Sequence, residues 1–143
     1  MVNSINKGKG FERVTAKLLT KLTGVDWQRV PQSGAFATVN RSEDPRFFGD
    51  VFTEDSEFSD VVIECKNYSA LELNDLFNEG SKFWKWVEQA STESKGLDWL
   101  LIIQIKRRGI FCVPSNLAVL KRFSLDKHPL IVLKHFTMLV KIR

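Results

Sequence analysis

Residues 49–67 read GDVFTEDSEFSDVVIECKN, and this stretch decides both the fold and the chemistry to be explained. Its apolar run, VVIECK, contains Glu64 and Lys66 one residue apart, and a second acid, Asp50, precedes it. Alternate residues of a strand share a face, so the glutamate and the lysine point to the same side. Because buried charge is costly unless it is paired or bound to a metal, the stretch predicts a site rather than plain core.

The same stretch predicts a β-hairpin, with strands over residues 49–53 and 60–66 and the polar turn TEDSEFS between them. If the turn is centred near Glu57, Asp50 lies opposite Glu64 with Cβ atoms ~5 Å apart. Two carboxylates at that separation repel each other, and a hard divalent cation with oxygen ligands removes the conflict. We therefore expect Asp50 and Glu64 to bind one cation.

The residues around Glu64 leave two interpretations of this strand. In the first, Cys65 adds its backbone carbonyl as a further metal ligand. In the second, the strand is exposed and Glu64 simply forms a surface ion pair with Lys66. The neighbours Val61 and Ile63 are typical of a covered strand, and unusual buried charge indicates a site, so we favour the first interpretation.

The rest of the pattern predicts a mixed α/β sheet. A helix over residues 5–23 ends at Gly24 and has an apolar stripe of Phe11, Val14, Leu18 and Leu22. A capping box, Ser69 with Glu72, opens a helix over residues 70–91 with a stripe that includes Leu73 and Phe77. The other expected elements are short strands at 29–31 and 36–39, strands over 98–106 and 110–113, a short helix over 115–123 capped by Ser115, and one or two strands over 130–143.

Length and composition fit one domain spanning residues 1–143, with no repeat or linker to divide it. The chain is 43% hydrophobic, yet no stretch is long enough to cross a bilayer, and its first ten residues lack the apolar core of a secretory signal. Two cysteines and two histidines are too few for a disulfide framework or a histidine metal cage. These features predict a cytoplasmic protein with no membrane partner.

Charge is distributed unevenly along the chain. Residues 1–30 carry a net charge of +4, residues 31–64 carry −6, residues 65–94 carry −2 and residues 95–143 carry +8. A polyanion suits the basic ends, and a divalent cation suits the acidic middle. Ordinary solvated surface charge explains the same distribution equally well.

The acids and the lysine together resemble the signature of the PD-(D/E)xK nuclease superfamily: Asp50, a gap, and then Glu64-Cys65-Lys66. That superfamily also places a glutamate on its first helix, where Glu12 stands here. The resemblance implies a restriction-endonuclease-like mixed β-sheet flanked by helices. It implies Mg²⁺, replaceable by Mn²⁺, held by Asp50, Glu64 and Glu12, with Lys66 as a catalytic residue. Taken alone, Glu12 would be a solvated helix carboxylate.

The segments KGKGFE, RVPQSGA, GDV and ECKN in this order resemble the archaeal Holliday junction resolvases and their phage-encoded relatives. The similarity runs from about residue 6 to residue 115, and Gly49 replaces the family's proline before the aspartate. It implies a nuclease that resolves branched double-stranded DNA by paired nicks. It also matches Ser33 to a catalytic serine on a mobile loop, although a simple turn serine is an equal alternative.

Six basic residues are candidate contacts to DNA phosphates: Lys7, Lys9, Arg29, Lys106, Arg107 and Arg108. The first three are individually better explained as solvated charges. The last three form a basic turn, QIKRRG, which either clamps a duplex arm or keeps a hairpin tip soluble.

The aromatic residues of the 70–91 helix bear on assembly. Trp84 and Trp99 suit the core, whereas Phe83 and Trp86 lie off the main apolar stripe, and base stacking is an alternative role for such rings. A helix with two apolar faces predicts a second burial partner. We therefore expect a homodimer, which suits the two-fold character of a four-way junction.

Two other functions stay open on the sequence. One is a restriction- or repair-type DNA endonuclease on the same scaffold, which would cut linear duplex as well as junctions. The other is a DNA-binding module without catalysis, against which the presence of Asp50, Glu64 and Lys66 argues.

Overall fold

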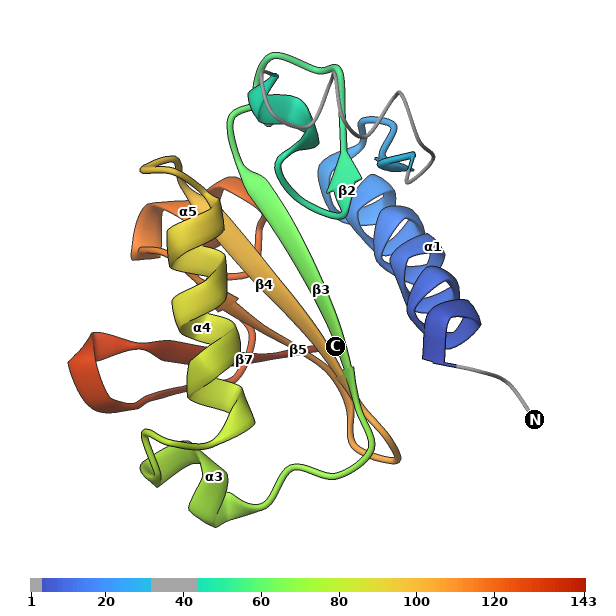
Figure 1. Cartoon of the computed structure of the whole chain (residues 1–143). Helices are drawn as coiled ribbons and strands as arrows, with labels where there is room; N and C mark the ends of the chain where they lie inside the picture. The colour runs from blue at the N-terminus through green and yellow to red at the C-terminus, as the bar shows by residue number, and fades with distance from the viewer. Residues whose placement is uncertain (1–3, 32–43) are drawn as a thin grey trace.

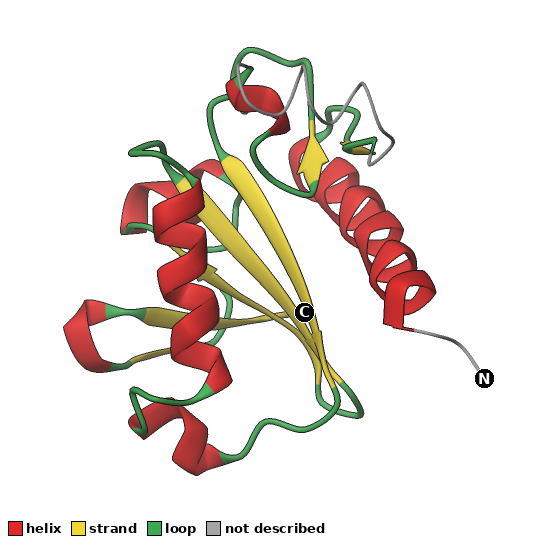
Figure 2. Ribbon diagram, viewed as in Figure 1, coloured by secondary structure: helices red, strands yellow, loops and turns green. Residues whose placement is uncertain are grey.

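The computed structural model describes residues 4–31 and 44–143, with side chains described from residue 10 onward. In this part of the chain seven strands form one sheet in the order β1-β2-β3-β4-β5-β7-β6 (Figures 1 and 2). Strands β3 and β4 pair in parallel, and the other neighbouring strands pair antiparallel. The strands are β1 (Gln28–Arg29), β2 (Val51–Phe52), β3 (Val62–Tyr68), β4 (Trp99–Ile105), β5 (Gly109–Pro114), β6 (Leu130–Val132) and β7 (Met138–Ile142).

Helices cover both faces of the sheet, which is the expected mixed α/β architecture (Figure 1). Helix α1 lies on one face together with α5, and α4 lies on the other, with α3 at its start. The α3–α4 segment makes the crossover that parallel strands such as β3 and β4 require. The helices are α1 (Ser4–Thr23), α3 (Leu73–Phe77), α4 (Lys82–Glu93) and α5 (Leu117–Arg122), and the 3₁₀ turns are η1 (Pro45–Phe47) and η2 (Lys134–Phe136).

Strand β4 is the centre of the core. Its residues Leu100 to Ile103 have no solvent-exposed area, and their side chains alternate between the two apolar clusters on the two faces of the sheet. A strand covered on both faces needs a continuous apolar run, as the sequence predicts for residues 98–106. No described helix is both long and apolar enough to cross a membrane.

The predicted hairpin register is confirmed. Val51 pairs with Ile63, as a turn centred near Glu57 requires, and this is the one residue pair of the β2–β3 ladder among the described residues. At Asp50 the pairing is irregular, because its N–H donates to the Ile63 carbonyl and its carboxylate accepts from the Cys65 N–H. The predicted alternation of β3 is confirmed as well: Ile63 and Cys65 pack toward α1, whereas Val62 packs toward α4. Both faces of β3 are therefore covered. β4 pairs with β3 along Val62–Tyr68, whereas β2 pairs with it only at Ile63, so Glu64 and Lys66 have a strand partner on one side only among the described residues.

Helix α1 forms where the sequence predicts it, and Gly24, with a φ of +78°, ends it. Its buried side chains, however, are Phe11, Thr15, Ala16 and Leu19, and Val14 is 44% exposed. The predicted stripe is therefore confirmed for Phe11, Leu18 and Leu22, which pack in the core, and wrong at Val14. The helix presents a threonine and an alanine to the sheet because a small side chain allows close packing there.

The single helix predicted over residues 70–91 is wrong, because the segment divides into α3 and α4. Glu72, not Ser69, caps α3, and its capping-box partner is Asp75. Leu73 is 72% exposed and Phe77 is 54% exposed, so Leu76 is the one residue of the predicted stripe that α3 buries. The break has a local cause: the Gly80 N–H donates to the Asn78 side chain at 3.0 Å, a turn that competes with helix.

The cap of α5 is also one residue later than predicted. The Asn116 side chain accepts from the Val119 N–H at 3.1 Å, whereas the Ser115 hydroxyl accepts from the Trp99 N–H at 3.0 Å and ties α5's start to β4. The short strand predicted at 29–31 is observed as β1, one residue earlier, and the C-terminal region forms two strands. The strand predicted at 36–39 lies outside the described residues.

Candidate active site

Asp50 immediately precedes β2, at a point where β2 approaches β3 closely. A Cβ at Gly49 would collide with the Ile63 carbonyl oxygen and lie 2.9 Å from the Ile63 nitrogen. The Asp50 N–H donates to that carbonyl at 2.7 Å, and its carboxylate accepts from the Cys65 N–H at 2.8 Å. These contacts fix the carboxylate, and they give the replacement of proline by glycine at position 49 a steric reason.

Glu64 presents a buried carboxyl group beside Asp50. The residue is 4% exposed, and its Oε1 has no hydrogen-bond partner among the described residues. Burial raises the pKa of this carboxyl to about 9, and the negative charges of Asp50 and then Glu93 act in the same direction. A buried carboxyl with an unpaired oxygen is costly, and a proton or a cation relieves that cost.

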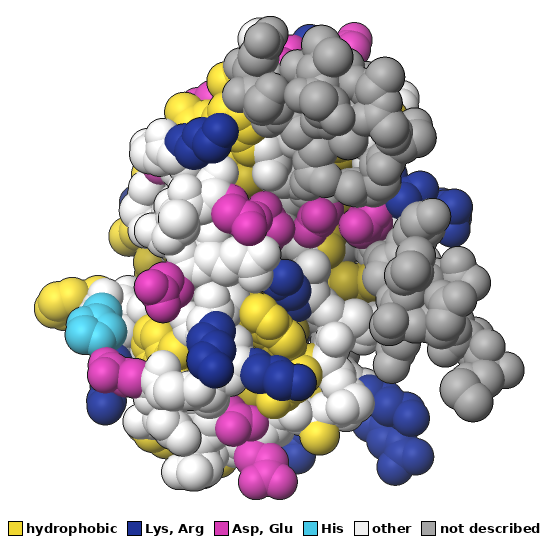
Figure 3. Space-filling model, viewed as in Figure 1, with side chains coloured by type: hydrophobic (Ala, Val, Ile, Leu, Met, Phe, Trp, Pro, Cys, Tyr) yellow, Lys and Arg dark blue, Asp and Glu magenta, His cyan; other side chains and the backbone are white. Residues whose placement is uncertain are grey.

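Lys66 lies two residues after Glu64 on β3 and therefore on the same face of the sheet. Its positive charge acts against the other neighbours and lowers the pKa of Glu64. Figure 3 shows a row of acidic side chains across the middle of one face of the molecule, with Lys or Arg side chains beside it. The effects of Asp50 and Lys66 on the pKa of Glu64 show that the structure brings these three side chains together.

Glu12 differs from Asp50 and Glu64 because its carboxylate forms an ion pair with Arg29. Its Oε2 accepts from the Arg29 Nε at 2.9 Å, and both side chains are largely covered. Arg29, a predicted DNA contact, therefore ties β1 to α1. In residues 4–31 and 44–143, no three His, Cys, Asp or Glu side chains form a group that could hold a metal. The described carboxylates at the centre are a pair, and Glu12 as a third ligand stays a prediction.

Glu93 is a carboxylate that the sequence pattern does not single out. It is the last residue of α4, its side chain is exposed, and its charge contributes to the raised pKa of Glu64. In the sequence it looks like any solvated helix residue. Only the crossover, which returns α4 over β3, brings it toward the site, and no local sequence pattern carries that information.

Cys65 faces the α1 side of the sheet, away from Glu64. Burial raises the pKa of its thiol well above the ordinary value, so the group stays protonated and is a poor metal ligand. Any contribution to a cation would come from the backbone carbonyl, as predicted. The Cys65 N–H already has a role, because it holds Asp50.

The remaining candidates lie away from the carboxylate pair or outside the described part. Lys106, Arg107 and Arg108 are exposed at the turn between β4 and β5, and Arg107 has a φ of +68°. Lys7 and Lys9 belong to the first turns of α1, but their side chains are outside what the structure describes, as is Ser33.

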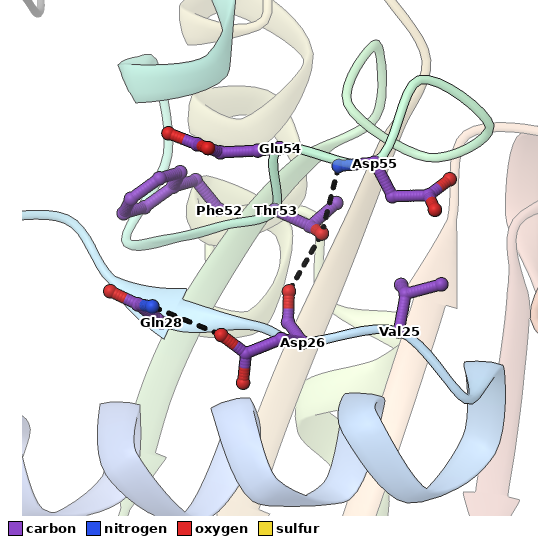
Figure 4. A pocket seen from close by; sticks show the side chains of 7 residues that line it. All are labelled: Val25, Asp26, Gln28, Phe52, Thr53, Glu54 and Asp55. Carbon is purple, nitrogen blue, oxygen red and sulfur yellow. Dashed lines mark hydrogen bonds between the residues drawn. The ribbon is translucent and has the colours of Figure 1, made fainter.

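A separate hollow of about 490 Å³ lies between the end of α1 and β2 (Figure 4). The Thr53 hydroxyl donates to the Asp26 carbonyl at 2.7 Å and accepts from the Asp55 N–H at 3.2 Å. The Gln28 side-chain amide donates to the Asp26 carboxylate at 3.0 Å. These polar groups form hydrogen bonds with one another, and none of them is a candidate site residue. The hydrogen bonds connect the residues after α1 to the β2 end of the hairpin, and we assign the hollow no part in catalysis.

Comparison with known proteins identifies the family of the chain. Residues 3–142 match the family described as "Phage putative PDDEXK endonuclease". The chain belongs to this family. It is also 33% identical over 101 residues to Protein D14 of Escherichia phage T5, a match that covers 68% of this chain and 60% of that protein. The chain thus spans less than two thirds of the length of this relative. No solved structure matches the chain.

The family to which the chain belongs is described as one of phage endonucleases. Nucleases of this class typically use a divalent metal. The residues present fit such an ion, because Glu64 Oε1 is buried without a partner among the described residues and lies beside a second carboxylate. Asp50 and Glu64 are therefore the residues of the described chain that would hold it.

Proposed function

We propose that residues 1–143 form one nuclease domain, a Mg²⁺-dependent, structure-selective endodeoxyribonuclease that resolves four-way DNA junctions. The observation that carries the catalytic part is the paired carboxyl groups of Asp50 and Glu64, with Lys66 on the same face of β3. The junction part is supported by the order of sequence segments shared with the resolvases, and family membership supports a nuclease acting on DNA.

Each residue of the centre has a task in phosphodiester hydrolysis. Water must attack phosphorus while the bond to the leaving sugar oxygen breaks, and that oxygen must take up a proton. Asp50, held by the Cys65 N–H, presents its carboxylate in one fixed orientation. Glu64 supplies the second carboxylate, and Lys66 orients the attacking water or stabilises the charge that develops on the phosphate. Mn²⁺ would substitute for Mg²⁺ at the same oxygens.

A bound Mg²⁺ supplies Lewis-acid activation of water and charge neutralisation at the phosphate. Asp50 and Glu64 would hold it, with the Cys65 carbonyl and Glu12 as further candidate oxygens. Glu12 would have to release Arg29, which would then be available to a DNA phosphate. Ser33 is proposed to contact the scissile phosphate, and Lys7, Lys9 and the basic 106–108 turn are proposed to contact the duplex arms.

The test is cleavage of an end-labelled immobile four-way junction by the full chain, with and without Mg²⁺. A linear duplex with the same arm sequences is the matched substrate, and the Asp50→Asn variant is the matched protein. We expect Mg²⁺-dependent, paired nicks in the junction, little cutting of the duplex, and a loss of at least about 100-fold in the variant. Cutting by Asp50→Asn at the parent rate would show that the centre is wrongly assigned.

The other outcomes separate the competing functions. Equal cleavage of junction and duplex would favour a restriction- or repair-type endonuclease with the same centre. Junction binding without cleavage in either Mg²⁺ or Mn²⁺ would favour a non-catalytic DNA-binding module.

We also propose a homodimer, acting in the cytoplasm of the phage-infected cell. The argument for a dimer from the second apolar helix face is partly wrong: Phe83 has no exposed area within one chain, so it needs no second burial partner. Support comes instead from the exposed apolar side chains Leu130, Ile131 and Val132 on the edge strand β6. Light scattering coupled to size-exclusion chromatography tests this, and a monomeric mass at micromolar concentration would contradict it.

A further inference from the structure

Strand β3 continues beyond the catalytic residues with an aromatic side chain on the same face. Glu64, Lys66 and Tyr68 alternate along the strand and pair with successive alternate residues of β4. Four residues of strand place Tyr68 about 13 Å from Glu64. That distance equals about four base-pair rises along a duplex axis, so Tyr68 lies within reach of a substrate strand held at the carboxylate pair.

Tyr68 meets Trp86 of α4, and both rings are half-buried. Their centroids are 4.8 Å apart with planes at 82°, an edge-to-face contact, and both rings pack against the apolar cluster under α4. The other three tryptophans, Trp27, Trp84 and Trp99, are buried. Tyr68 and Trp86 (the Tyr68–Trp86 pair) are therefore held rigidly by the core while part of their surface remains open, as a stacking platform requires.

The charges around the Tyr68–Trp86 pair favour a neutral base at the rings and a phosphate near Lys82. The Lys82 Nζ lies 6.0 Å from the centre of the Tyr68 ring, one helical turn before Trp86. Burial raises the pKa of the Tyr68 phenol, and the carboxylates of Asp75 and Glu72 act in the same direction. These acids repel a phosphate but not a neutral base, whereas the exposed Lys82 attracts a phosphate. Figure 3 shows hydrophobic side chains flanked by Lys or Arg side chains next to the acidic row.

We propose that the Tyr68–Trp86 pair stacks on an unstacked nucleobase of the substrate, with Lys82 on an adjacent phosphate. This inference rests on the proposed nuclease function and names its substrate class: DNA that offers an unstacked base near the cut, at a branch point or in a single-stranded segment. A base inside a continuous duplex is not available for such stacking. The pair thus supplies structure selectivity that the catalytic residues do not.

The test uses 2-aminopurine, whose fluorescence falls on stacking, placed at one position at a time around the branch point of a four-way junction and of a flapped duplex. The Asp50→Asn protein holds the DNA uncut. We expect a fall in fluorescence at one or two positions, and none in a continuous duplex of the same sequence. Tyr68→Leu and Trp86→Leu should abolish the signal and weaken binding about tenfold. Tyr68→Phe keeps the ring and should retain both.

Phe77→Ala removes an exposed aromatic ring elsewhere on the α3–α4 segment and is the matched control; it should behave like the parent. Thermal unfolding establishes that each variant is folded. If a leucine variant is unfolded, the 2-aminopurine scan with the Asp50→Asn protein alone tests whether a base is stacked. No response at any probe position, or folded leucine variants that bind and quench like the parent, would overturn the inference. If the parent cuts branched DNA with Mg²⁺ while the probes stay silent, only this inference fails. If it cuts no DNA, the proposed function fails.

Discussion

At the scale of single residues, Glu64 is the most informative group in the molecule. Its pKa of about 9, against an ordinary value of 4.5, means that the folded chain without metal holds a proton that the unfolded chain releases. Between these two pH values the folded state binds more protons, so the free energy of unfolding falls as pH rises. The slope is at most about 1.4 kcal/mol per pH unit, and the loss is complete above the folded pKa.

We therefore predict that the free energy of unfolding of the metal-free protein falls between about pH 5 and pH 9, and that Glu64→Gln removes this contribution. Mg²⁺ should stabilise the parent more at pH 9 than at pH 6, because the cation binds the ionised carboxyl. Chemical denaturation at both pH values, with and without Mg²⁺, measures this. Glu88→Gln, an exposed α4 carboxylate, is the control and should follow the parent. The same pH slope in Glu64→Gln and the parent would contradict the assignment.

Gly49 gives a second prediction at this scale. Gly49→Ala should destabilise the fold by about 1–3 kcal/mol and reduce cleavage, because the new Cβ would collide with the Ile63 backbone and displace Asp50. Gly10→Ala in α1 is the matched control: nothing lies within 4 Å of its added Cβ, and alanine favours helix by roughly 0.5–1 kcal/mol. Denaturant titration of both variants decides, and equal stability of the two would be inconsistent with the close strand approach.

At the scale of elements, the α3–α4 segment is where burial departs from the predicted stripe. Phe83 has no exposed area, whereas Phe77 is 54% exposed. Phe83→Ala should therefore cost about 3–5 kcal/mol of unfolding free energy, and Phe77→Ala should cost less than about 0.5 kcal/mol. Urea titration of the two variants provides the comparison. Similar losses would contradict the burial of Phe83 and the exposure of Phe77.

The sequence specifies some elements of this fold better than others. Burial on both faces requires the apolar run of β4 and the alternation of β3, so a single sequence is enough to recognise both patterns. The hairpin register follows from the alternation of β3. The prediction of one helix over residues 70–91, capped by Ser69, is wrong for a different reason. Ser69 with Glu72 has the spacing of a capping box, but Glu72 with Asp75 has it too, and tertiary contacts choose between them.

The candidate site shows the same division. Asp50, Glu64 and Lys66 lie close in sequence on one hairpin, so local pattern brings them together. The pairing of Glu12 with Arg29 and the approach of Glu93 depend on how α1 and α4 pack on the sheet. A short stretch of sequence does not specify how two distant elements pack against each other. The raised pKa of Glu64 likewise arises from burial by the whole fold.

At the scale of the whole molecule, the basic 106–108 turn is expected to contribute to DNA affinity through charge. Replacing Lys106, Arg107 and Arg108 by alanine should weaken junction binding by Asp50→Asn protein at low salt. It should also reduce the slope of log affinity against log salt by up to about 3, close to one for each phosphate that is no longer neutralised. Lys121→Ala, an exposed lysine on α5, is the control. An unchanged slope in the triple variant would show that the turn only keeps the hairpin tip in solution.

The central claim is that Asp50 and Glu64 form one divalent-cation site, and the most direct measurement is Mn²⁺ binding followed by electron paramagnetic resonance without DNA. We predict that Asp50→Asn and Glu64→Gln each weaken Mn²⁺ binding by at least about tenfold, because each removes a charged oxygen ligand. Glu88→Gln, remote from the pair in sequence, should bind as the parent does. Parent-like Mn²⁺ affinity in both Asp50→Asn and Glu64→Gln would contradict the site on which the nuclease mechanism depends.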